Sequence, residues 1–303
     1  METGGDNPIE PQPVEVAPAS PPTSSASEPT PSEPPLDQPI RWTYRHSLPV
    51  RVGHWINALS LFILIMSGLQ IFNAHPALYW GNRSDRNEAL VSIRPVRMES
   101  GEIKGMTTVL GRSFDTTGVL GYSDHTARAF PAWATIPGPR WLAMGRQWHL
   151  FFAWVFVVTG VLFMSYALFS RHLVGDLLPT RWDLRGIGRA IKDHLLFRHT
   201  QGDAATRYNV LQKLAYLVVL FVLAPLMLLT GLSMSPTIDA AFPWLLHLFG
   251  GRQGARTIHF IACFSFVGFI GIHVFQVMIT GFVNNMRSMI TGWFAIKEAN
   301  HGA

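Results

Sequence analysis

Four long stretches of the chain contain no Asp, Glu, Lys or Arg and are largely apolar. They cover residues 52–82, 147–170, 214–238 and 257–286. Each exceeds the length of about 20 residues that a helix needs to cross about 30 Å of hydrocarbon. A lipid-exposed backbone must satisfy its own hydrogen bonds, and these stretches lack the period-2 alternation of barrel strands. The pattern therefore predicts an all-α membrane protein with a four-transmembrane-helix bundle. We place the helices at about residues 50–73, 146–170, 211–235 and 255–284.

Composition supports this reading and separates the N-terminus from the rest. Of the 303 residues, 48% are hydrophobic and 14% are charged, against about 25% charged in a soluble protein. Residues 1–40 hold eleven prolines, seven acidic residues and no Lys or Arg, which predicts a disordered acidic tail. Removing its seven negative charges from the formal net charge of +5 leaves +12 on residues 41–303. That charge suits anionic lipid head groups, and no motif indicates a nucleic-acid partner.

The distribution of basic residues predicts the orientation in the membrane, because short loops rich in Lys and Arg stay in the cytoplasm. The segment before the first helix and the link between the second and third helices are basic, so both termini are expected to be cytoplasmic. The residues are Arg41, Arg45, Arg51, Arg171, Arg181, Arg185, Arg189, Lys192, Arg198, Arg207 and Lys213. The opposite link carries only Arg252 and Arg256. Residues 73–146 are then extracytoplasmic, and their length suggests a small cap or docking surface.

Four histidines fall inside the apolar stretches, where an ionisable side chain indicates function. His259 and His273 are fourteen residues apart on the fourth helix. They therefore differ by about 40° in rotation around the helix axis, which puts them on the same face, and they lie roughly 21 Å apart along the axis. Matching depths pair His54 with His273 toward the cytoplasm and His149 with His259 toward the outside. Each pair could supply the two axial ligands of one b-type haem iron, which predicts two haems.

Arginines precede three of these histidines by three residues, on the same helix face. Arg51, Arg146 and Arg256 are therefore candidate contacts for haem propionates, and Arg287, fourteen residues beyond His273, is a fourth. Interfacial anchoring explains these arginines about as well. Small residues also recur in the helices, where they could receive a macrocycle or simply let helices approach. They are Gly53, Ser67, Gly68, Gly160, Thr230, Gly231, Gly268 and Gly271.

Other metal chemistry is disfavoured. Cys263 is the only cysteine, so no cysteine-ligated zinc or iron–sulfur site is available. The histidine pairs are too far apart for a tetrahedral zinc site, and no Asp or Glu lies near them in the apolar stretches. Among the remaining histidines, His75 sits where the first helix exits and could approach the outer haem edge or a partner.

The sequence resembles the di-haem cytochrome b subunits of respiratory oxidoreductases over about residues 44–290. This group includes the formate dehydrogenase gamma subunit and the nickel–iron hydrogenase cytochrome b. The resemblance rests on residues 46–55 (His-Ser-Leu-Pro-Val-Arg-Val-Gly-His-Trp) and on the His259/His273 spacing. Residues 73–80 and 208–216 look most like thiosulfate reductase cytochrome b subunits. The resemblance implies a bacterial inner-membrane location, an extracytoplasmic molybdopterin-type partner, and a quinone site near His54 and His273, with Lys213 as a candidate quinone or propionate contact.

Three functions remain open at this point. The leading one is an electron-transfer subunit of a membrane-bound respiratory oxidoreductase complex, exchanging electrons between the quinone pool and an extracytoplasmic enzyme through two haems. A second is a stand-alone quinol oxidoreductase that reduces oxygen or superoxide. A third is a haem-free transporter or membrane scaffold, which the absence of intramembrane carboxylates disfavours.

Overall fold

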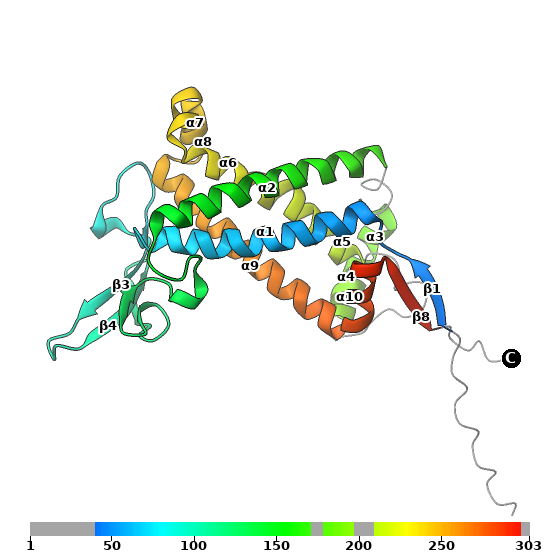
Figure 1. The fold of residues 1–303 in the computed structure, drawn as a ribbon, viewed down its shortest axis with the longest axis horizontal. Coiled ribbons are helices and arrows are strands. Elements are labelled where there is room, and N and C mark those ends of the chain that lie inside the picture. The colour runs from blue at the N-terminus through cyan, green and yellow to red at the C-terminus, as the bar shows by residue number, and fades with distance from the viewer. Residues whose placement is uncertain (1–39, 171–177, 197–208, 298–303) are drawn as a thin grey trace, which may run out of the picture. The chain divides into compact units, whose positions relative to one another are not determined.

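The computed structural model describes residues 40–170, 178–196 and 209–297. Within this part of the chain, four helical spans are long and apolar enough to cross a membrane (Figure 1). They are α1 (Leu48–Phe72), α2 (Leu142–Phe169), the third span Val210–Ser233, and α9 (Arg252–Ile279). The four predicted membrane helices are thus present. Residues 1–39 of the predicted tail, and Arg171, Arg198 and Arg207, lie outside the described residues.

The third span is not one regular helix. It consists of α5 (Val210–Val218), a π-helical turn η5 (Val219–Leu223) and α6 (Ala224–Ser233). Pro225 lacks an N–H, and its ring would clash with the carbonyl four residues earlier in a regular helix. The wider π turn accommodates this, and the Ala224 N–H bonds to the Val219 carbonyl, five residues back.

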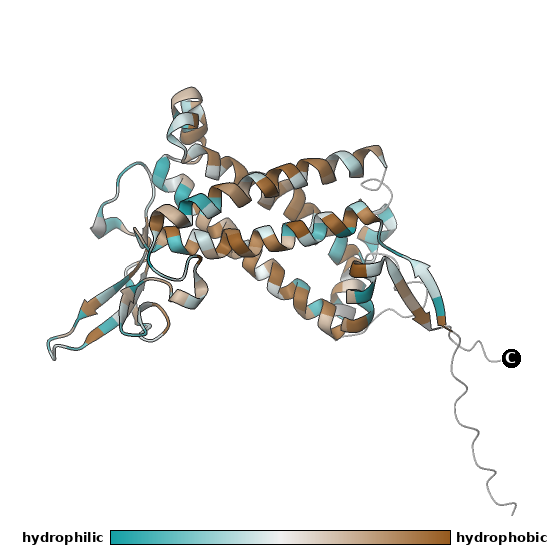
Figure 2. Ribbon diagram, in the orientation of Figure 1, coloured by the Kyte–Doolittle hydropathy of each residue, from teal (hydrophilic) through white to brown (hydrophobic). Residues whose placement is uncertain are grey.

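The four spans form two closely packed pairs. α1 runs along α2, and α6 packs against α9 (Figure 1). The backbone of α9 approaches α1 and α2 at few points. The residues of these helices are mainly hydrophobic along their length (Figure 2), as expected for contact with lipid. The two pairs are therefore joined across a wider space by side chains, which is where the candidate site lies.

The segment between α1 and α2 contains strands, so the all-α prediction is wrong outside the membrane helices. Four short strands form an antiparallel sheet in sequence order, and two more form a hairpin beside it. The first four are β2 (Ala77–Leu78), β3 (Val91–Arg97), β4 (Ile103–Val109) and β5 (Arg112–Asp115); the hairpin is β6 (Gly121–Ser123) and β7 (Thr126–Arg128). Gly101 and Gly111, at φ +84° and +82°, make the turns on either side of β4. We call residues 73–141 the outer cap, after the side of the membrane on which the sequence predicts them.

A second small sheet joins the two ends of the described chain at the opposite end of the helices. β1 (Ile40–Tyr44) pairs antiparallel with β8 (Trp293–Lys297), and α10 (Phe282–Thr291) leads into β8. Gly292 ends α10 at φ +90°, where a Cβ would lie 2.5 Å from the Tyr44 ring. Glycine is needed there for both the left-handed turn and the close approach.

Four shorter helices complete the described part of the fold. They are α3 (Arg181–Arg185), α4 (Ile187–Leu195), α7 (Pro236–Ala241) and α8 (Pro243–Leu248). The two 3₁₀ turns, η1 (Arg86–Glu88) and η2 (Ala132–Ala134), lie in the outer cap. These elements connect the membrane spans at their ends.

Buried apolar and polar contacts together hold the outer cap on α1. The apolar core consists of Phe72, Leu78, Ile93, Ala129 and Phe130. Asn73, at the end of α1, accepts from the Phe130 N–H at 2.7 Å and donates to the Phe130 carbonyl at 3.2 Å. Arg128 donates to the Gln70 amide oxygen and to the Thr135 hydroxyl. Burial lowers the pKa of the Arg128 guanidinium, and nearby Arg140 adds to this.

Replacing Asn73→Ala should destabilise the outer cap, because the buried N–H and carbonyl of Phe130 would both lose their partner. We expect a fall of roughly 2–4 kcal/mol in the free energy of unfolding. Thermal unfolding in detergent, followed together with protease cleavage of the cap, measures this. The exposed Asn87→Ala is the matched control and should behave like the unsubstituted protein. Equal stability of the two variants would contradict the assignment.

Candidate haem-binding site

Two pairs of histidines face each other between α9 and the α1–α2 pair. His54 of α1 and His273 of α9 have ring centroids 6.2 Å apart, with ring planes at 54°. His149 of α2 and His259 of α9 have centroids 6.3 Å apart, with planes at 61°. The structure thus brings together the same pairs that matching depth predicts, one near each end of α9.

The spacing within each pair fits an iron ion held between two imidazoles. Two metal–imidazole bonds of about 2 Å each, with half a ring on either side, give roughly 6 Å between centroids. A Cβ added at Gly53, Gly160, Gly268 or Gly271 would meet nothing within 4 Å, so these positions are open to a macrocycle or to lipid. In the described part of the chain, no three His, Cys, Asp or Glu side chains gather as a tetrahedral metal site would require. The residues present therefore fit haem rather than zinc.

The outer pair, His149 and His259, is held by two hydroxyl groups that the sequence analysis named only as small residues, without their contact to the histidines. The Ser67 Oγ lies 3.1 Å from His149 Nδ1, and the Thr230 Oγ1 lies 3.0 Å from His259 Nδ1. The glycine that follows each hydroxyl also faces the same imidazole. Gly68 and Gly231 therefore receive histidine rings rather than a macrocycle. The signal was a Ser-Gly or Thr-Gly dipeptide inside an apolar helix.

The inner pair has a different environment. His54 Nδ1, Asn57 Oδ1 and Ser60 Oγ are buried atoms of α1 with no hydrogen-bond partner among the described residues. The Trp55 ring lies edge-on to His54 at 5.2 Å, and the Phe269 ring stacks on His273 at 5.9 Å. Aromatic contacts therefore position the inner imidazoles, whereas hydroxyl groups position the outer ones.

The candidate propionate arginines mostly have partners in the protein. Arg51 donates to the Ile290 carbonyl of α10. Arg256 donates to the carbonyls of His75 and Ala77 in the outer cap and lies over the Phe72 ring.

The other two arginines are exposed. Arg287 lies 5.1 Å from the centroid of the Trp42 ring, and Arg146 is on the surface of α2. Arg51, Arg256 and Arg287 therefore help fix neighbouring elements. The propionate role of all four arginines stays a prediction.

Comparison with known proteins identifies the family. The model of the family described as prokaryotic cytochrome b561 matches residues 45–292. The chain belongs to this family. Membership implies b-type haem binding and membrane electron transfer, in agreement with the predicted cytochrome b.

Two curated proteins are similar to this cytochrome. "Putative protein-methionine-sulfoxide reductase subunit YedZ1" of Azospira oryzae is 27% identical over 230 residues, 75% of this chain and 87% of that protein. "Probable Ni/Fe-hydrogenase B-type cytochrome subunit" of Cupriavidus necator is 23% identical over 270 residues, 86% of this chain and 89% of that protein. No solved structure gave a significant match.

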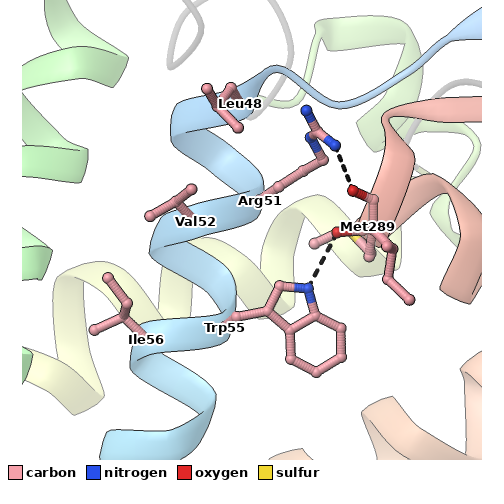
Figure 3. Close-up of a pocket in the computed structure, with 7 residues that line it drawn as sticks. Leu48, Arg51, Val52, Trp55, Ile56 and Met289 are labelled. Carbon is pink, nitrogen blue, oxygen red and sulfur yellow. Dashed lines mark hydrogen bonds between the residues drawn. The ribbon is translucent and has the colours of Figure 1, made fainter.

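A groove lies on the cytochrome at the start of α1, and its lining includes Trp55, whose ring contacts His54 (Figure 3). It has a volume of about 310 Å³, and one of its walls is the exposed apolar side of the first two turns of α1. The Trp55 Nε1 donates to the Met289 carbonyl at 3.1 Å, which holds the indole between α1 and α10. Arg51 is the charged residue of the lining, and its Nε has no partner among the described residues. The groove is thus lined by apolar side chains, with the Arg51 guanidinium as its one charged group.

Lys213 has a partner other than a quinone or a propionate. Its ammonium lies 2.8 Å from the Asp183 carboxylate, and the side chains of Lys213 and Asp183 are 12% and 30% exposed. The hydrogen bond from Lys213 is the main reason that the pKa of Asp183 lies below its usual value; the Thr180 N–H also contributes. The ion pair ties α3 to the start of α5. The quinone or propionate contact of Lys213 stays a prediction.

Replacing Asp183→Asn should remove a pH-dependent contribution to stability. Because the pKa of Asp183 is lowered in the folded state, this contribution is complete above the unfolded pKa of about 3.9 and is lost as the pH falls through the folded pKa. We expect a loss of at most about 1 kcal/mol at pH 7. Thermal unfolding from pH 7 to pH 3 measures it, and the difference from the unsubstituted protein should disappear at the acid end. Exposed Asp124→Asn is the control, and a shift of equal size there would refute the role of the ion pair.

Proposed function

We propose that this cytochrome b561-type protein binds two b-type haems and carries electrons between the quinone pool and an extracytoplasmic redox enzyme. The observation that supports this most strongly is the pair of imidazole couples, 6.2 and 6.3 Å apart, near the two ends of α9. His54 and His273 hold the inner iron, and His149 and His259 hold the outer iron. When bound, the two haems supply one-electron carriers at two depths of the bilayer.

The residues around each level suit different tasks. Quinone exchanges at the inner level, where the groove beside Trp55 offers apolar walls to a ring and tail and the Arg51 guanidinium to a carbonyl oxygen. A quinol that binds there releases two electrons and two protons. The outer level lies under the cap, which carries exposed apolar side chains such as Phe114 on β5 and Val119 in the following loop to meet a partner.

The names of the relatives support a partner. Both are named as subunits, one of a methionine-sulfoxide reductase and one of a nickel–iron hydrogenase. We infer that this chain also serves a redox enzyme, and that the enzyme is of the molybdopterin type, as the resemblance to thiosulfate reductase subunits implies. The basic residues near β1 and α3 favour an orientation in the bacterial inner membrane with both termini in the cytoplasm.

Replacing the four histidines one at a time by Ala tests the pairing. His54→Ala and His273→Ala should each remove the same haem, and His149→Ala and His259→Ala should each remove the other. The reason is that both axial imidazoles of a couple would hold its haem, so that loss of either one should release it. The measurements are the haem-to-protein ratio, expected to fall from two to one, and the reduced-minus-oxidised spectrum.

The exposed His247→Ala is the control, since its ring lies on α8 and not in either couple. It should keep both haems. Loss of one and the same haem in all four core variants, or a ratio of one in the unsubstituted protein, would defeat the two-haem proposal.

Turnover without a partner distinguishes the proposal from a stand-alone oxidoreductase. Purified protein in liposomes should accept electrons from added quinol until its haems are reduced and then stop, even with oxygen or superoxide present. Spectroscopic haem reduction and quinol consumption are followed together. Sustained quinol consumption at many equivalents per haem, with the oxidant as the only acceptor, would favour the stand-alone enzyme instead.

A further inference from the structure

The two histidines of the outer pair are held in the same way on two different helices. Ser67–Gly68 on α1 faces His149, and Thr230–Gly231 on α6 faces His259. In both cases the hydroxyl oxygen meets the ring Nδ1, at 3.1 and 3.0 Å. We call each dipeptide a hydroxyl–glycine cradle. The same dipeptide contact occurs on α1 and α6, which are far apart in the sequence. This indicates that both imidazoles need such a hydroxyl partner.

The hydrogen bonds of the cradles determine which ring nitrogen carries the proton. The Ser67 hydroxyl lies closer to the Ile63 carbonyl, at 2.7 Å, than to the ring nitrogen. The Thr230 hydroxyl likewise lies 2.6 Å from the Leu226 carbonyl. A carbonyl oxygen can only accept a hydrogen bond, so each hydroxyl donates its single hydrogen to the carbonyl. The hydroxyl oxygen then accepts a hydrogen bond from the ring. Nδ1 therefore carries the proton in both rings. With Nδ1 protonated, Nε2 keeps its lone pair, which is the state that a metal ligand requires.

The glycine of each cradle sets the distance of the ring from the helix. A Cβ at Gly68 would lie 3.3 Å from His149 Cε1, and a Cβ at Gly231 would lie 3.4 Å from His259 Cε1. A Cβ at Gly68 would require the His149 ring to shift by a few tenths of an ångström, and a Cβ at Gly231 would already be in van der Waals contact with the His259 ring. The glycine and the hydroxyl thus fix the ring position and the tautomer together.

The inner pair lacks this support on the side of α1. His54 Nδ1 is buried and has no hydrogen-bond partner among the described residues, whereas both outer rings have one. Hydrogen bonding at the far nitrogen raises the basicity of a metal-bound imidazole. A more basic ligand stabilises the more positive, oxidised iron and so lowers its reduction potential.

We infer that Ser67 and Thr230 are positioning residues that hold His149 and His259 as Nδ1–H tautomers and thereby lower the reduction potential of the outer haem. This inference rests on the proposed function, because it requires a haem between these two histidines. It assigns a task to two residues that contact neither the iron nor a substrate. The two levels are consequently tuned separately, by the side chains next to each histidine pair.

Redox titration of the full chain in a His54→Ala background, which leaves the outer haem alone, tests this inference. Ser67→Ala and Thr230→Val should each raise the midpoint potential, because the ring loses an acceptor. We expect up to about a tenfold change in the oxidised-to-reduced ratio at a fixed potential, about 59 mV for a one-electron couple. Ser67→Thr and Thr230→Ser keep the hydroxyl and should keep the potential.

Controls separate a redox role from a packing role. Ser265→Ala removes an exposed hydroxyl of α9 that bonds to the Ile261 carbonyl, and it should leave the potential unchanged. In the complementary His149→Ala background, Ser67→Ala should not move the potential of the inner haem. A purely structural hydroxyl would lower the melting temperature without changing the potential, and that result would overturn the inference.

Two further outcomes are decisive. If Ser67→Ala releases the outer haem, Ser67→Thr decides: retention of the haem at its original potential supports the inference, and loss of the haem overturns it. A failure of the proposed function looks different, because the His54→Ala protein would then hold no single haem to titrate.

The electron paramagnetic resonance signal of the ferric haem gives a second readout, since it responds to ring orientation and should move in Thr230→Val but not in Thr230→Ser.

Discussion

Two imidazole couples, each joining α9 to a different helix of the α1–α2 pair, are the constraint on which the rest of the fold depends. The helices surrounding them are apolar, and four ionisable rings within such helices would be costly without partners. α9 makes few backbone contacts with α1 and α2, so side chains fix its distance from them, at one end through Phe72 with Phe260 and the bonds of Arg256 to the outer cap. A metal centre held between the rings would compensate the cost and set that distance. The α1–α2 and α6–α9 pairs are then two halves of one cofactor-binding unit.

The two ends of this unit differ in rigidity. The outer histidines have hydroxyl partners, and beside them lies a cap that is joined to α1 by the bonds of the buried Asn73 and Arg128 side chains. At the inner end, the buried Nδ1 of His54 has no partner among the described residues, and an open groove lies at Trp55. A fixed outer end suits electron transfer to a docked protein, because the distance does not change. An adaptable inner end suits a ligand that must enter, react and leave.

Local sequence signals predicted the helices and the histidine pairs but not the details around them. Charge-free stretches identify membrane helices directly, and a spacing of fourteen residues places His259 and His273 on one face. The cap between the first two helices was predicted from its length, but its strands were missed because they are short and no single segment of them is distinctive. Ser67 is 82 residues from His149, so its hydrogen bond follows from helix packing alone. The partners of Arg51 and Arg256 are backbone carbonyls, which every residue offers and no sequence marks.

The π turn in the third span connects these observations. A π turn inserts one residue into the helix, and one residue corresponds to a rotation of about 100° for everything that follows. Lys213 on α5, before the turn, faces Asp183 of α3, whereas Thr230 on α6, after it, faces His259 of α9. In an uninterrupted helix these two side chains would have a different angular relation, and one of the contacts would be lost. Pro225 therefore does more than kink the helix. By favouring the π turn, it allows one span to contact Asp183 of α3 through Lys213 and His259 of α9 through Thr230.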